Sequence, residues 1–219
     1  DEDIYQRGLP AARANLAGGC DAVLVDTPGD VPFSKPADLG PETAAHMAVV
    51  ADRIRRELGR PIGINVLANA ALPALAVASA SGAGFIRVNQ WANAYVANEG
   101  FMEGEAARAM RYRARLRANG IRIFADAHVK HGAHAIVADR PVEELVRDPV
   151  ATVSAFDSIA HPRIPLPIGL YRSQGYQRDN SMGINLANDD QLRTLAEGLN
   201  HAGAGTWSAA PLVPGAEVT

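Results

Sequence analysis

Three ionisable side chains occupy alternate positions near the middle of the chain. The segment 121–131, IRIFADAHVKH, passes from apolar residues directly to Asp126, His128 and Lys130. Successive side chains of a β-strand point to opposite faces, so these three would share one face of a strand. A carboxylate, an imidazole and an ammonium group held together can transfer protons, with His128 or Lys130 as the general acid or base. The alternative is a polar strand end that only caps the next loop.

Polar residues also stand within or just after three earlier apolar segments. Strands are predicted at 21–25 (DAVLV), 61–67 (PIGINVL) and 85–89 (FIRVN). The polar residues associated with them are Asp26, Asn65, Arg87 and Asn89. A buried polar group without a partner costs about 1–3 kcal/mol, so four strands that repeat this cost favour a binding site over simple packing. We expect these four residues to bind a small polar ligand beside the catalytic group of Asp126, His128 and Lys130.

Two other interpretations of these residues stay open. Asp26 and Asp126 could hold a divalent cation together with the amide oxygens of Asn65 and Asn89, since hard cations take oxygen ligands. No metal-ligand spacing specifies such a site, so we assign no metal, and the sequence identifies no cofactor. The set could also be a structural polar network without chemistry. The sequence contains no GxxxxGK motif and no GxGxxG after a strand, so a nucleotide-binding fold is unsupported.

Helices are predicted between the strands. Their ranges are 4–17, 41–58, 71–81 and 103–119, followed by a fifth helix that begins within 139–153. The first two show apolar residues at the spacing of a helix face. Strands that alternate with helices across short loops are typical of β/α units around a parallel sheet. The sequence therefore predicts an α/β fold with four parallel strands before residue 132.

Composition restricts the classes of function. The 219 residues suffice for one sizeable domain plus an appendage. Lysine and arginine number 21 and aspartate and glutamate 24, so the net charge of −3 gives no electrostatic reason to bind nucleic acid. No apolar run approaches the ~20 residues that span a bilayer. The single cysteine, Cys20, is expected to be buried, and the lack of a signal peptide predicts a cytoplasmic protein.

The last third of the chain has a different character. Residues 160–183 are rich in proline and show neither helical nor strand periodicity, which predicts an extended arm. One helix is predicted within this part, at 189–201. We therefore expect a β/α domain at residues 1–150 and an irregular arm with one short helix at residues 151–219.

The first part of the chain resembles the BtpA/SgcQ family. The resemblance covers about residues 2–148 and rests on GGCDAVLVDTPGDVPF, PIGINVLAN, GAGFIRVN and FADAHVKHGAH. That family is regarded as a (β/α)8 barrel of the TIM type, related to barrels that bind ribulose phosphates. Its members have been linked to photosystem I biogenesis, and no established reaction is attached to it. The resemblance implies a barrel whose site region includes the seven polar residues named above, and it does not supply their roles.

From about residue 148 the chain resembles a different protein family. RDPVATV, HPRIPLPIGLY, RDNSMGINLAND and TWSAAPLVPG are similar to the connector between the two enzyme domains of bifunctional PutA proteins. Neither the flavin-binding residues of the PutA proline dehydrogenase barrel nor the catalytic cysteine of its aldehyde dehydrogenase can be matched. Proline oxidation is therefore not implied.

About four of the eight β/α units of a family barrel are recognisable. A partial barrel leaves its apolar interior open, which predicts a homo-oligomer, a partner protein or the C-terminal arm over the open side. The leading hypothesis is a BtpA-family barrel protein that binds a small polar or phosphorylated metabolite, with acid–base chemistry by His128 or Lys130. The alternatives are a non-catalytic assembly factor, as in photosystem I biogenesis, and a fusion fragment without evolved activity.

Overall fold

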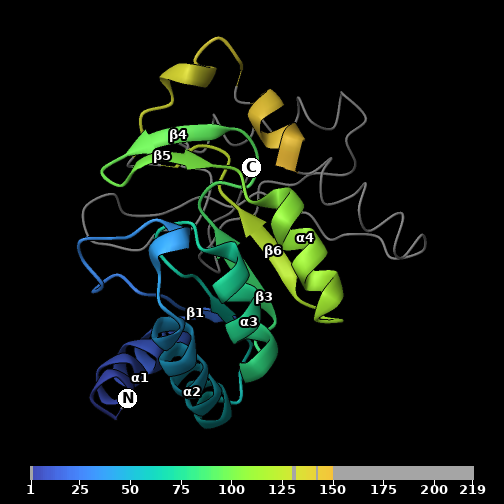
Figure 1. The fold of residues 1–219 in the computed structure, drawn as a ribbon. Helices are drawn as coiled ribbons and strands as arrows, with labels where there is room; N and C mark the ends of the chain where they lie inside the picture. The colour runs from blue at the N-terminus through green and yellow to red at the C-terminus, as the bar shows by residue number, and fades with distance from the viewer. Residues whose placement is uncertain (1, 130–131, 142, 150–219) are drawn as a thin grey trace, which may run out of the picture. The chain divides into compact units, whose positions relative to one another are not determined.

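The computed structural model describes residues 2–129, 132–141 and 143–149 of the chain (Figure 1). These residues form two compact units. The first contains residues 2–88 and 111–124, and the second contains residues 89–110 and the described part of 125–149. The predicted arm, its helix at 189–201 and the domain boundary after residue 150 all concern residues outside the described part. They stay predictions.

The first unit is built on a parallel sheet with the strand order β1-β2-β3-β6. Its strands are β1 (Val23–Val25), β2 (Ile62–Ile64), β3 (Phe85–Val88) and β6 (Arg122–Ala125). Four parallel β/α strands are therefore confirmed, although each is shorter than predicted. β2 is an example, because Leu67 donates its backbone N–H to the hydroxyl of Thr27 at 3.0 Å instead of continuing the ladder.

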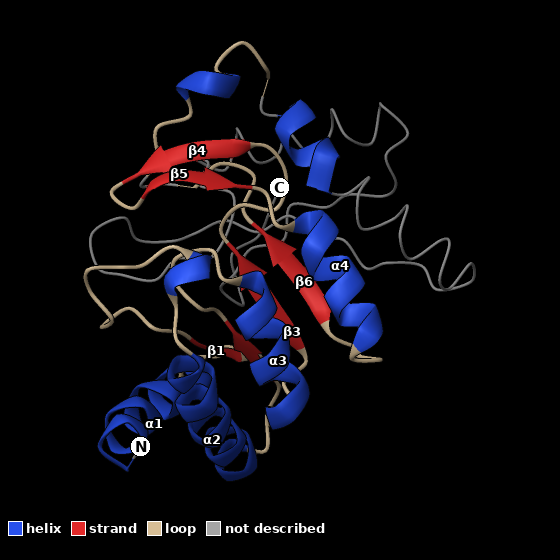
Figure 2. Cartoon of the chain, in the orientation of Figure 1, coloured by secondary structure: helices blue, strands red, loops and turns tan. Residues whose placement is uncertain are grey.

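Three helices pack in the first unit, and their ends follow from local signals. They are α1 (Glu2–Ala17), α2 (Pro41–Leu58) and α3 (Ala71–Ser81). Figure 2 shows α1 beside α2, and α2 and α3 contact each other and the sheet. α2 begins at a proline and ends at Gly59, whose φ of 59° suits glycine and whose N–H reaches the carbonyl of Arg55. The predicted bounds of α2 and α3 are confirmed.

An apolar layer lies between the sheet and these helices. The strands contribute Ile62, Ile64 and Ile86, none of which is exposed to solvent. The helices contribute Ile54 and Leu75, which are also buried. Burying side chains of this size contributes about 1.5–3 kcal/mol each, so this layer holds the first unit together.

An aromatic pair lies on the opposite face of the same sheet. Gly63 and Phe85 are register partners, and a Cβ built on Gly63 would lie only 2.0 Å from the Phe85 ring. The Phe85 ring therefore fills the space that a side chain at position 63 would need. The rings of Phe85 and Phe124 stand with centroids 4.7 Å apart. We call these two rings the aromatic layer.

The second unit contains a β-hairpin that the sequence did not predict. Its antiparallel strands are β4 (Ala94–Ala97) and β5 (Gly100–Glu103). The predicted helix start at residue 103 is wrong, because Glu103 pairs with Ala94 and α4 occupies Ala106–Arg115. Gly104 separates strand from helix. A Cβ there would lie 2.6 Å from the carbonyl oxygen of Trp91, so only glycine permits this close approach.

The remainder of the second unit is short-range structure. A 3₁₀ turn, η2, covers Ala135–Val137, and residues 143–149 are helical, within the range predicted for the fifth helix. Val96 and Ala133 exchange two backbone hydrogen bonds, at 3.1 and 2.7 Å, which attach the segment before η2 to β4.

Two general expectations can be compared with this fold. Cys20 is exposed, so the prediction of a buried thiol is wrong. The residue follows Gly19, whose φ is 98°, in the turn between α1 and β1, outside every helix and strand that the structure describes. Among the helices of the described residues, none combines the length and the apolar character needed to cross a membrane.

Candidate functional site

Three of the predicted residues lie in one transverse row across β1, β2 and β3. Val25 and Ile64 are register partners, and the N–H of Asn65 donates to the carbonyl of Val25 at 2.9 Å. Asp26 and Asn65 are therefore neighbours just past the two strand ends. The pairing of Ile64 with Ile86, continued by one residue, places Arg87 on the other side of Asn65. We call Asp26, Asn65 and Arg87 the polar row.

The polar row shares a face with the aromatic layer. Side chains two residues apart on a strand point to the same face, so Asn65 follows Gly63 and Arg87 follows Phe85. Neighbouring strands are about 4.8 Å apart, which makes the row about 10 Å wide. The row is thus a polar strip at the carboxyl ends of three strands, next to an apolar floor. Ligands of α/β proteins bind at such strand ends.

Asn65 is the centre of the row and its least satisfied member. Its relative exposure is 1%, and neither its Nδ2 nor its Oδ1 has a hydrogen-bond partner among the described residues. Leaving such a group buried and unpaired costs about 1–3 kcal/mol. An amide that offers both a donor and an acceptor without using either is suited to a ligand that provides the complementary pair.

Asp26 and Arg87 interact electrostatically across the row. Burial raises the pKa of the Asp26 carboxyl above its ordinary value, and the positive charge of Arg87 opposes that rise. Arg87 is itself buried. The row therefore combines a carboxyl group that holds a proton more readily than usual with a guanidinium group suited to an anionic ligand.

Three of the other four predicted residues are described in the second unit, namely Asn89, Asp126 and His128. Asp126 is buried, at 2% exposure, and Asn89 is buried with an Oδ1 that has no partner among the described residues. His128 is exposed. Lys130 lies outside the described residues, so its predicted role is untested. The structure thus brings together three of the seven predicted residues in a single row, and the catalytic assignment stays a prediction.

His128 belongs to a group of three ring side chains in the second unit, in which His134 contacts the other two. The rings of His128 and His134 are stacked, with centroids 3.7 Å apart and an interplanar angle of 27°. Tyr95 of β4 lies on His134, with ring centroids 5.7 Å apart. We call these three side chains the ring stack. The sequence prediction missed His134, although its position in FADAHVKHGAH, six residues after His128, is the signal that could have found it.

The environment of His128 favours the neutral imidazole. Partial burial lowers the pKa of His128, and the adjacent His134 lowers it further, since two protonated rings in contact would repel each other. A neutral imidazole in contact with solvent is a competent proton acceptor near neutral pH.

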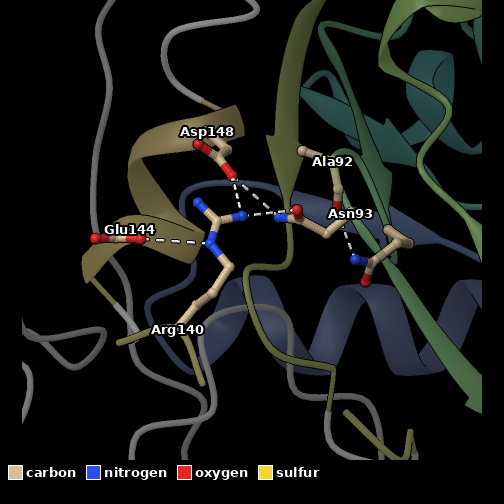
Figure 3. A network of polar contacts seen from close by, with 6 residues as sticks. Ala92, Asn93, Arg140, Glu144 and Asp148 are labelled. Atoms are coloured by element: carbon tan, nitrogen blue, oxygen red, sulfur yellow. Dashed lines mark hydrogen bonds and ion pairs between the residues drawn. The ribbon is translucent and has the colours of Figure 1, made fainter. Parts of the chain in front are cut away.

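A polar network in the second unit was also missed, and Figure 3 shows it. Arg140 donates from Nη1 to Asp148 Oδ2 at 2.7 Å and to Asn93 Oδ1 at 2.9 Å, while Asn93 Nδ2 donates to the same Asp148 oxygen at 3.2 Å. Glu144 accepts from the Nε of Arg140 at 3.3 Å. Because these groups satisfy one another, we interpret the network as a structural tie between the residue before β4 and the helical residues 143–149.

A shallow cavity of about 450 Å³ lies beside the hairpin of the second unit. Its lining includes Trp91, Phe101 and Glu103. The indole Nε1 of Trp91 is buried and has no partner among the described residues. The cavity contains none of the seven predicted residues, so it is separate from the predicted chemistry. Within the described part of the chain, no three His, Cys, Asp or Glu side chains gather in a group that could hold a metal ion.

The fold and the polar row define a class of protein. A parallel sheet with helical connections and polar residues at the carboxyl ends of adjacent strands is the arrangement of β/α-repeat proteins. The chain belongs to the BtpA family, whose model matches residues 2–160. The closed barrel implied by the resemblance is not confirmed by the four-stranded sheet and stays a prediction.

Known relatives agree with the family assignment. The chain is 46% identical over 133 residues to an uncharacterised protein of Thermococcus kodakarensis, covering 61% of this chain and 50% of that protein. It is 42% identical over 131 residues to an uncharacterised protein of Archaeoglobus fulgidus, with coverage of 60% and 52%. The Photosystem I biogenesis protein BtpA of Synechocystis is 39% identical over 128 residues, with coverage of 58% and 44%.

These comparisons also limit the assignment. The chain spans about half the length of the curated relatives it matches. No solved structure matches it significantly. The resemblance of residues 148–219 to the PutA connector stays a prediction, since residues 150–219 lie outside the described part of the chain.

Proposed function

We propose that this BtpA-family chain binds a small polar metabolite at the polar row. The observation that carries the proposal is the buried amide of Asn65, whose donor and acceptor both lack partners among the described residues. Its neighbours in the row are a carboxyl group with a raised pKa and a guanidinium group. A buried set of this kind is costly to the folded chain, and a ligand offsets the cost by supplying the missing hydrogen bonds.

The chemistry of the row indicates the chemistry of the ligand. Arg87 suits a phosphate or carboxylate, because a guanidinium binds both in a bidentate manner. Asp26 and Asn65 suit hydroxyl groups, which donate and accept hydrogen bonds. A phosphorylated sugar carries both kinds of group and matches a row about 10 Å wide. The family resemblance to barrels that bind ribulose phosphates supports the same ligand class.

The proposal assigns acid–base chemistry to the motif that follows β6. His128 provides an imidazole that favours its neutral form, and Lys130 is the alternative acid or base. Asp126, which is buried, would orient its neighbours electrostatically. Proton abstraction from a carbon next to a carbonyl group is the reaction class that a neutral imidazole performs on a ketose phosphate.

Binding is tested by calorimetric titration with ribulose 5-phosphate and, separately, with inorganic phosphate. We expect the sugar phosphate to bind, and Asn65→Leu and Arg87→Met to abolish its binding. Asn15→Leu, which changes an exposed asparagine on α1, is the matched control and should bind as the wild type does. Equal binding by wild type and Asn65→Leu would show that the polar row is not the site.

Acid–base activity is tested by incubating the chain with ribulose 5-phosphate in D₂O and following loss of the carbon-bound proton signals by NMR. We expect exchange with the wild type and none with His128→Ala. Binding in the titration above should survive this substitution. Exchange at the wild-type rate in His128→Ala and in Lys130→Met would remove the catalytic assignment and leave the binding proposal standing.

A non-catalytic assembly role is the second candidate. It is favoured by the 39% identity to a protein named for photosystem I biogenesis. On this hypothesis a protein partner binds independently of the chemistry-bearing residues. A partner retained by the double variant Asp126→Asn/His128→Ala, in a chain that fails to bind ribulose 5-phosphate, would support assembly over metabolite binding.

We also propose that a second copy or a partner protein covers the sheet beyond its edge strands, which are β1 and β6 in the four-stranded sheet. Exposed strand edges favour association. Sedimentation equilibrium gives the mass directly. A mass of about 23 kDa at micromolar concentrations, against the 23.1 kDa of one chain, would contradict self-association.

A further inference from the structure

His134 is held by a hydrogen bond that determines where its ring proton lies. Its Nε2 stands 2.8 Å from the backbone carbonyl oxygen of Val129. A carbonyl oxygen only accepts hydrogen bonds, so Nε2 must carry the proton and donate it. In the neutral ring, Nδ1 is then the unprotonated nitrogen. One face of this oriented ring is stacked on His128.

The hairpin also supports His134. Tyr95 of β4 contacts its ring, and the two backbone hydrogen bonds between Val96 and Ala133 attach the residue before His134 to the same strand. Gly132 completes the support. A Cβ at Gly132 would lie 2.4 Å from Cδ2 of Tyr95, so the absence of a side chain lets the tyrosine ring approach.

Three independent contacts therefore converge on one residue that the predicted site does not include. His134 has a hydrogen bond to Val129, a ring contact to Tyr95 and a stacking contact to His128. We propose that His134 is a positioning residue, which holds the His128 imidazole in one orientation for proton transfer. The inference rests on the acid–base role proposed for His128, and it adds a residue and a mechanism to it.

The stack also has an electrostatic consequence. Among the described residues, His134 is a titratable group in direct contact with the His128 ring, and Tyr95 in turn contacts the His134 ring. Burial and the proximity of His134 both lower the pKa of His128. His134 thus positions a proton acceptor and adds to the lowering of its pKa.

Three substitutions separate these effects in the 219-residue chain. His134→Ala removes the ring and the hydrogen bond. His134→Asn keeps a donor for the Val129 carbonyl and removes the ring. His134→Phe keeps a stacking ring and removes the ring nitrogens, and with them the donor to the Val129 carbonyl. His46→Ala, which changes an exposed histidine in α2, is the control.

The readout is an NMR titration of the His128 ring proton between pH 5 and 8. We expect His134→Ala and His134→Asn to remove the ring-current shift of His128 and to move its titration midpoint upward, towards the ordinary value of about 6.5. His134→Phe should retain a ring-current shift. His46→Ala should change neither quantity. An unchanged His128 signal and midpoint in His134→Ala would overturn the proposal.

A measurement on the wild-type chain tests the proposal even if the variants fail to fold. The long-range nitrogen–proton spectrum of the histidine rings distinguishes the two neutral tautomers. We expect His134 to carry its proton on Nε2, and a proton on Nδ1 would overturn the proposal. Neither NMR readout requires a metabolite. The positioning role can therefore fail while ribulose 5-phosphate still binds, and it can hold if no sugar phosphate binds.

Discussion

Asp26 and Arg87 lie at opposite ends of one row across three parallel strands, with Asn65 between them. Their charges are coupled, because Arg87 opposes the rise in pKa that burial imposes on Asp26. Under the proposed function, a ligand that spans the row would meet a carboxyl group at one end and a guanidinium group at the other. We expect it to place its hydroxyl groups at Asp26 and an anionic group at Arg87.

Asn65→Leu should make the folded chain more stable while it abolishes ligand binding. The substitution keeps the number and branching of the side-chain heavy atoms and removes a buried amide that has no partner among the described residues. We expect the free energy of unfolding to rise by about 1 kcal/mol, the lower end of the cost of an unpaired buried polar group. Urea denaturation measures it, with Asn15→Leu as the exposed control. A loss of stability would mean that the amide has an intramolecular partner.

Gly63→Ala should destabilise the first unit. A Cβ at this position would overlap the Phe85 ring, which is buried and packed on Phe124. We expect a loss of about 1–3 kcal/mol in the free energy of unfolding, the usual cost of an overpacked core. Gly84→Ala is the control, since a Cβ there meets nothing within 4 Å. Phe85→Leu in the same chain should restore part of the loss, and equal effects of Gly63→Ala and Gly84→Ala would contradict the overlap.

Asp26→Asn should change the pH dependence of stability. The folded chain raises the pKa of Asp26, so its protonated form is favoured by folding. The protonated carboxyl group therefore adds to the free energy of unfolding. This contribution is complete at pH values below the pKa of the unfolded chain, about 3.9, and it is lost as the pH rises through the pKa of the folded chain. Urea denaturation from pH 3.5 to 7 should show a smaller decline in Asp26→Asn than in the wild type. Arg87→Met should steepen the decline, and Asp21→Asn, an exposed control, should leave it unchanged.

His128→Gln should alter stability at the acidic side of neutrality. The folded chain lowers the pKa of His128, so folding favours the neutral ring. The associated stability is present above the unfolded value of about 6.5 and is lost as the pH falls through the folded pKa. Thermal melting between pH 5 and 7.5 should show this loss in the wild type and less of it in His128→Gln. His46→Gln should melt as the wild type does, and identical profiles for His128→Gln and wild type would refute the shift.

Asp148→Asn should weaken the second unit and remove part of its sensitivity to acid. Burial alone would raise the pKa of Asp148, and hydrogen bonds from Arg140 and Asn93 reverse this, so the pKa is below its ordinary value. The carboxylate therefore stabilises the fold above the unfolded pKa of about 3.9, and that contribution is lost as the pH falls through the folded pKa. We expect a small decrease in melting temperature at pH 7 and none at pH 2.5. A decrease of equal size at both values would point to packing instead of charge.

Local signals account for the parts of the fold that sequence reasoning predicted. α2 and α3 were predicted to the residue because glycine at positions 59 and 82 adopts a positive φ, which ends a helix at a defined point. The hairpin β4–β5 was missed for a different reason. Its strands have four residues each, too few to show a period of two, and the start of α4 depends on the contact between Gly104 and Trp91. No local pattern encodes that contact.

In the candidate site, too, residues that follow a local sequence pattern were predicted, and residues defined by tertiary contacts were missed. The polar row could be predicted because Asn65 and Arg87 interrupt apolar strands whose ends must meet at one edge of a parallel sheet. His134 could not be found in this way, since it lies in a segment without periodicity and acquires its role from Val129 and Tyr95. Lys130 lies outside the described residues, so its predicted role as an acid or base is tested by the proton-exchange experiment on Lys130→Met.

The fit between Gly63 and Phe85 also has a consequence for related sequences. One position lacks a side chain and its register partner supplies a ring that fills the space. The two positions therefore share a fixed volume. Natural variants of this sheet should substitute them together, so that alanine or a larger residue at position 63 is accompanied by a smaller one at position 85. Covariation of this pair across family members would show that a single packing constraint acts on both positions.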